Sequence, residues 1–119
     1  MFHIVNALRR SPAVKQVQVV DLIDEATVKH LKCRAELIDG STLHVTESSI
    51  IGKNKYSYHW QDAHNQLIIR WDNAPHHPHL ASFPHHRHEG GTVHENPRIA
   101  IDEVLVEIEN RFKVVGILS

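Results

Sequence analysis

The segment HLKCRAELIDG, residues 30–40, decides how this chain folds. Its apolar residues alternate with polar or charged ones, which is typical of an antiparallel strand with one buried face. The apolar positions are Leu31, Cys33, Ala35 and Leu37. Asp39-Gly40 follows directly and is a hairpin signal, because such residues tolerate a positive φ. We therefore expect the chain to turn back here and to continue as a neighbouring strand.

The same period of two recurs on both sides of this segment. It is found in residues 16–23, 42–47, 55–60 and 67–72. The first of these is expected to pair with the strand that contains Cys33, across a turn at Asp24 and Glu25. Because side chains alternate along a strand, His59 should face away from Trp60. Together the segments predict an antiparallel β-meander of four to five strands.

Helical spacing appears at the two ends of the chain. Phe2, Val5 and Leu8 recur at helical intervals, and Ser11-Pro12 ends this helix because a residue before proline avoids the α region. Near the other end, Asn96-Pro97 resembles an N-cap followed by proline at the first helical position. One apolar helical face follows, formed by Ile101, Val104, Leu105, Ile108 and Phe112. We expect a single α+β domain over residues 1–119, with the N-terminal and C-terminal helices covering one sheet face.

Composition excludes several classes of protein. The formal net charge of −1 excludes a strongly basic nucleic-acid-binding protein, so any contact with nucleic acid must be local. Cys33 is the only cysteine, which excludes an internal disulfide and Cys-rich zinc modules. The chain lacks a P-loop, a Rossmann glycine pattern and a G-x-S-x-G elbow. It also lacks a signal peptide and an apolar stretch of ~20 residues, so we expect a cytoplasmic protein without membrane contact.

Six of the 12 histidines lie in PHHPHLASFPHHRH, residues 75–88. Three prolines exclude a helix, so we expect a loop with an edge strand near Ser82 and Phe83. No cofactor is expected, because the spacing differs from the helical H-E-x-x-H motif. A site for zinc or another divalent transition metal is the alternative, with ligands from His76, His77, His85, His86 and His88. A pH-dependent positive patch and a polar loop without function also stay open.

The histidines also allow acid–base chemistry on RNA. Cleavage without a metal requires a base, an acid and a cation beside the phosphate. His59 and Arg70 should face each other on adjacent strands, and Asp72 shares the face of Arg70. The candidate catalytic residues are Glu47, His59, Arg70, Asp72, His85, His86 and His88, and the candidate substrate-binding residues are Lys55, Tyr58 and Arg87. A solvated ion pair at Arg70 and core packing of the aromatic residues are the alternatives.

Four sequence blocks carry a family resemblance. They are Gly40-Ser41-x-Leu43 leading to Glu47, then KYSYHWQD (55–62), RWDNAPHH (70–77) and FPHHRH (83–88). In this order they resemble the TumE family over about residues 31–106. The resemblance implies the toxin half of a prokaryotic toxin–antitoxin pair, with a cognate antitoxin as its partner. Ser48-Ser49 departs from the family pattern, which has an aromatic residue there.

Three hypotheses about function follow. The first is a toxin that acts on RNA as a metal-independent endoribonuclease, a domain similar in outline to RelE-like and barnase-like ribonucleases, which forms a complex with its antitoxin or a homodimer. The second is a non-enzymatic module that holds a metal or a protein with the His-rich segment. The third is an interaction protein whose exposed aromatic residues dock a helix or strand of a partner.

Overall fold

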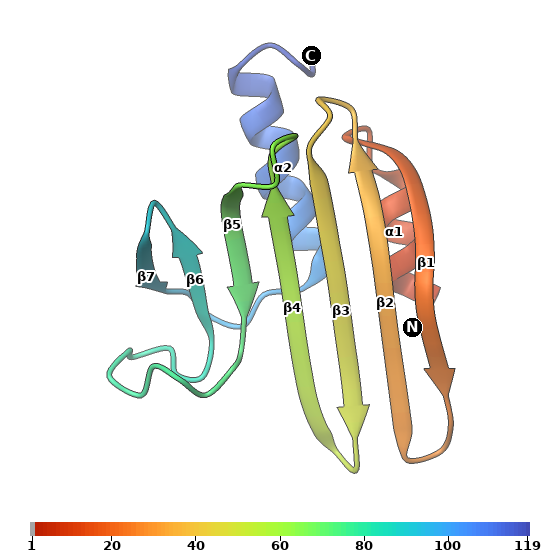
Figure 1. Ribbon diagram of the computed structural model, residues 1–119, viewed down its shortest axis with the longest axis vertical. Coiled ribbons are helices and arrows are strands. Elements are labelled where there is room, and N and C mark those ends of the chain that lie inside the picture. The colour runs from red at the N-terminus through yellow and green to blue at the C-terminus, as the bar shows by residue number, and fades with distance from the viewer. Residues whose placement is uncertain (1) are drawn as a thin grey trace.

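Every strand of the sheet lies beside the strand that follows it in the chain (Figure 1). The computed structural model describes residues 2–119, except for the side chain of Phe2. The strands are β1 (Val14–Asp24), β2 (Val28–Leu37), β3 (Thr42–Ile50), β4 (Lys53–Gln61), β5 (Leu67–Asp72), β6 (His86–Glu89) and β7 (Thr92–Glu95), and the helices are α1 (Phe2–Arg10) and α2 (Ile101–Val114). The α+β class and the meander are confirmed, but the expected strand number is wrong, because the sheet has seven strands.

The hairpin at Asp39-Gly40 forms as expected. Gly40 has a φ of +87°, and the Asp39 carboxylate accepts a hydrogen bond from the backbone N–H of Ser41 at 2.9 Å. The expected pairing of the first strand is also confirmed, since Val19 of β1 lies opposite Cys33 of β2. The alternation of residue types thus fixed both the turn and the register of these strands.

Strands β6 and β7 are the two that sequence patterning missed. The edge strand expected near Ser82 and Phe83 is wrong, because these residues lie in turns in which Phe83 N–H donates to Leu80 and His85 N–H donates to Ser82. Beyond Pro84 the backbone has its N–H groups again, and β6 pairs with β5. Gly90-Gly91, with φ of +63° and +75°, then closes the β6–β7 hairpin.

Both helices cover the same face of the sheet (Figure 1), as expected. The alternation in β2 shows which face is buried, because Leu31, Cys33 and Ala35 are at most 2% exposed while their sequence neighbours are exposed or only partly buried. The largest fully buried side chains of this core are Trp71 of β5 and Tyr58 of β4. Within residues 2–119, neither helix is long and apolar enough to cross a membrane. The other sheet face is left without a helix, and we call it the open face.

Helix α2 begins later than its sequence suggested. Asn96 is not its N-cap: the Asn96 backbone N–H donates to the Ser82 hydroxyl at 3.0 Å. The helix starts at Ile101, where the Glu103 carboxylate accepts a hydrogen bond from the Ala100 backbone N–H at 3.2 Å. The helix begins late because β7 ends at Glu95 on the edge of the sheet. Residues 96–100 are needed to bring the chain back to the covered face.

Candidate functional site

Three side chains form a line across the open face. His59 on β4, Arg70 on β5 and His88 on β6 are register partners in adjacent strands, so all three point to the same side of the sheet. His59 Nδ1 lies 3.2 Å from an Arg70 Nη1 atom. We call these residues the open-face row. The expected pairing of His59 with Arg70 is confirmed, and the structure adds a second imidazole, His88, on the strand at the other side of Arg70.

The Asp72 carboxylate contacts two members of this row, Arg70 and His88. Its carboxylate accepts hydrogen bonds from Arg70 Nε at 3.0 Å and from the Ala74 backbone N–H at 2.9 Å. It also lies 3.0 Å from His86 Nε2 and 3.6 Å from His88 Nε2. Asp72 is 4% exposed and His86 is 2% exposed, so this pair is shielded from water. A buried carboxylate with several donors fixes the rotamers of its partners.

The His-rich loop brings further imidazoles to the same place. Residues 73–85 link the end of β5 to the start of β6, and this loop carries His77 to within 4.7 Å of His86 and 5.6 Å of His88, measured between ring centroids. The rings of His86 and His88 are 4.9 Å apart. His86 Nδ1 donates to the Pro84 carbonyl at 2.8 Å, which orients its ring. Segments distant in sequence therefore converge on one cluster.

Burial keeps two imidazoles of the row in the neutral form. It lowers the pKa of His59, and the positive charge of Arg70 lowers that pKa further. Burial also lowers the pKa of His88, and this effect exceeds the opposite effect of the nearby Asp72 carboxylate. At neutral pH both rings are therefore available as proton acceptors.

A cleft of about 490 Å³ lies next to the row on the open face. This volume falls within the usual range for ligand pockets. Arg70 and Lys55 bring positive charge to its lining, and Asp72 also lines it. The remaining lining residues are Thr46, Ser48, Tyr56, Ser57, Asn73, Ala74, Pro75 and His76. That Lys55 binds substrate stays a prediction, and the position of Lys55 in the lining of this cleft agrees with that prediction.

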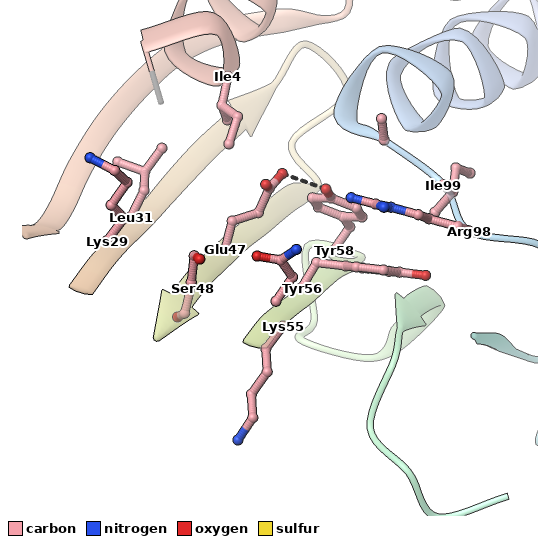
Figure 2. A pocket seen from close by; sticks show the side chains of 13 residues that line it. Ile4, Lys29, Leu31, Glu47, Ser48, Lys55, Tyr56, Tyr58, Arg98 and Ile99 are labelled. Atoms are coloured by element: carbon pink, nitrogen blue, oxygen red, sulfur yellow. Dashed lines mark hydrogen bonds between the residues drawn. The ribbon is translucent and has the colours of Figure 1, made fainter. Parts of the chain in front are cut away.

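A second, smaller cleft of about 270 Å³ lies on the covered face, between the start of α2 and the ends of β3 and β4 (Figure 2). Here the Tyr58 hydroxyl donates to Glu47 at 2.5 Å, and Arg98 extends towards this pair. Burial and the Glu47 carboxylate raise the pKa of Tyr58. The Tyr56 hydroxyl lies 2.8 Å from His85 Nδ1, and the two rings are stacked.

The expected catalytic residues are thus divided between two faces. His59, Arg70 and His88 form the row, and Asp72 and His86 lie directly beside it. Glu47 and His85 do not join them. Glu47 was expected among the catalytic residues, but it is a register partner of Leu31 and Tyr56 and therefore lies on the covered face, away from Arg70.

Other candidate residues also lie away from the row. Tyr58 is 2% exposed and bonded to Glu47, so it packs in the core. Arg87 is a register partner of Trp71 on the covered side, and its Nε lies 3.4 Å from Glu89. Arg98 was missed altogether, because the sequence around it was interpreted as the start of a helix.

Comparison with known proteins gives one match. A family model described as "Toxin TumE" matches residues 4–112. No curated protein and no solved structure matches the chain. The match spans most of both helices, all seven strands and all of the residues of the open-face row.

Proposed function

The chain belongs to the TumE toxin family, and from this premise we propose that it is the toxin of a toxin–antitoxin pair, that it cleaves RNA, and that a cognate antitoxin neutralises it. The observation that carries the proposal is the open-face row, in which Arg70 lies between two imidazoles. A phosphodiester bound to Arg70 would have one imidazole on each side. This is the arrangement that acid–base cleavage of RNA requires.

The reaction needs no group beyond these side chains. One neutral imidazole takes the proton of the ribose 2′-hydroxyl, and the 2′-oxygen forms a bond to phosphorus. The bond from phosphorus to the 5′-oxygen breaks, and the second imidazole, in its protonated form, gives a proton to that oxygen. The products are a 2′,3′-cyclic phosphate and a free 5′-hydroxyl. Arg70 stabilises the extra negative charge on the phosphorane.

We assign the base to His59 and the acid to His88. His59 lies beside the Arg70 guanidinium, which disfavours a second positive charge there. His88 lies 3.6 Å from the Asp72 carboxylate, which partly offsets the lowering of its pKa by burial and makes His88 the better proton donor of the two. The neighbouring cleft, with Lys55 in its lining, would receive the adjoining nucleotide. Local positive charge of this kind is sufficient for RNA contact in a chain of nearly neutral net charge.

Expression without the antitoxin tests the proposal. We expect growth arrest on induction, together with RNA fragments that end in 2′,3′-cyclic phosphate and 5′-hydroxyl groups, because the row uses the 2′-hydroxyl as the nucleophile. The purified protein should give the same ends in the presence of a chelator. Normal growth with intact RNA, or fragments with 3′-hydroxyl and 5′-phosphate ends, would refute the proposed chemistry.

The pH dependence of RNA cleavage should reflect the environment of His59. The base must be neutral, and the pKa of His59 is lowered, so it stays neutral to more acidic pH than an ordinary imidazole does. The acidic limb of a profile of kcat/KM against pH is therefore expected below the usual imidazole pKa of 6.5. An acidic limb centred above that pH would contradict the assignment of His59 as the base.

A further inference from the structure

Three imidazoles converge at the β6 end of the open-face row. One ring nitrogen from each of His77, His86 and His88 lies within 4.8 Å of the others. The rings are nearly perpendicular to one another, with interplanar angles of 70°, 71° and 78°. The three rings thus pack in T-shaped contacts, and the short separation of their nitrogen atoms leaves room for one ion between them. A tetrahedral zinc ion needs ligand atoms roughly 3.3 Å apart, given Zn–N bonds of about 2.0–2.1 Å.

The hydrogen bond of His86 to Pro84 uses Nδ1 and leaves Nε2 as the nitrogen that could bind a metal. Its Nδ1–H donates to the Pro84 carbonyl at 2.8 Å, so Nε2 can carry the lone pair. Histidines that bind metals commonly use their other ring nitrogen in this way, to bond a backbone carbonyl. Since His86 is 2% exposed, the strand and the loop hold its ring in place. His77 lies on the loop and can close the remaining distance by rotation of its side chain.

A carboxylate lies beside two of these imidazoles. Asp72 Oδ1 lies 3.0 Å from His86 Nε2, and Asp72 Oδ2 lies 3.6 Å from His88 Nε2. These distances are close to those between neighbouring ligands of one tetrahedral ion. We propose that His77, His86, His88 and Asp72 bind one divalent transition-metal ion, with Zn²⁺ as the ion to test, since imidazole with carboxylate is a ligand set that zinc accepts.

A simpler account covers only part of the cluster. A doubly protonated His86 would donate to both Pro84 and Asp72 and would need no metal. That account explains two of the four residues. It gives no reason for a ring nitrogen of His77 and one of His88 to lie within 4.8 Å of each other and of His86. The metal accounts for all four residues.

The metal site and the proposed ribonuclease both need His88. A lone pair on His88 Nε2 that is bound to a metal is unavailable for proton transfer. This consequence rests on the proposed function: the metal-loaded protein should lose the acid of the open-face row, and zinc should inhibit RNA cleavage. His77 belongs to the metal site and not to the row, so it separates the two roles.

Calorimetric titration tests the site itself. The full chain is purified without an affinity tag or a metal resin, treated with a chelator, and titrated with Zn²⁺ alone. We expect one ion per chain, and replacement of His77 with glutamine (H77Q) should weaken binding by more than about 100-fold, which exceeds the usual effect of losing a second-shell partner. His64 is exposed in the β4–β5 loop, so H64Q is the control and should bind as the wild type does.

Two outcomes would overturn the site. One is no stoichiometric binding by the wild-type chain. The other is equal binding by the wild type and H77Q, which would mean adventitious zinc on scattered histidines. Circular dichroism spectra of each variant show whether it is folded, and His77 lies on a loop where substitution leaves the core intact.

RNA cleavage supplies a separate readout. Zinc should inhibit the wild type and H64Q, whereas cleavage by H77Q should no longer respond to zinc. If none of the proteins cleaves RNA, the proposed function fails, while the calorimetry still decides the metal site. If RNA is cleaved but zinc does not bind, the metal site fails and the ribonuclease remains.

Discussion

Replacement of Arg70 with methionine (R70M) should lower kcat/KM for RNA cleavage by about 10²–10³-fold, the usual cost of removing one group that stabilises transition-state charge. The guanidinium lies 3.2 Å from His59, and Arg70 is the register partner of His88, so the substitution would remove the proposed phosphate contact between the two imidazoles. Growth arrest on expression should be lost in the same variant. Initial rates on a short RNA oligonucleotide measure the effect.

Arg34 provides the matched control. It also projects from the open face, three strands away on β2, and is exposed. R34M removes the same charge from the same surface and should retain cleavage within a few-fold of the wild type. Equal losses in R70M and R34M would show that the toxin needs only a positive surface. In that case the open-face row would have no special role.

Replacement of Asp72 with asparagine (D72N) should destabilise the protein by about 1–3 kcal/mol, the usual cost of leaving buried hydrogen-bond donors without their acceptor. The carboxylate is 4% exposed and lies within 3.6 Å of Arg70, His86 and His88. The amide keeps the shape but removes the charge, and its NH₂ group would face donors. Urea denaturation at neutral pH measures the free energy of unfolding.

Asp21 is the control for this experiment. It lies 3.5 Å from His30 on the same face, but it is exposed, so it forms the surface equivalent of the Asp72–His86 pair. D21N should cost less than about 1 kcal/mol, as exposed ion pairs do. A similar small loss in D72N would mean that the Asp72 carboxylate adds little to stability and that packing holds the His-rich loop in place.

The part of the site that lies on regular strands was predictable, because alternation of residue types indicates which segments are strands and which side chains share one face of the sheet. The alternation in residues 55–60 and 67–72 was sufficient to place His59 opposite Arg70. The same rule, applied one step further, would have placed Glu47 with Leu43 and Val45 on the covered face. That error was one of interpretation and not of missing information.

The position of His88 was not predictable in the same way. Its register depends on the path of residues 73–85, and loop paths are set by turns and tertiary contacts, not by a repeating pattern. One local signal was present, because Gly90-Gly91 is a hairpin dipeptide, and it would have revealed β6 and β7. The start of α2 was predicted too early for a related reason. Asn96 is a typical N-cap residue, but it lies just after β7 at the sheet edge, where the core offers no surface for a helix.

The order of the strands has a consequence for synthesis of the protein. Since each strand pairs with the one made just before it, the sheet can assemble in the direction in which the ribosome delivers the chain. His59 and Arg70 emerge early, whereas His88 emerges late and α2 last. A chain that is still being synthesised therefore has the proposed base, His59, but lacks the proposed acid, His88. It would become toxic only when translation is nearly complete.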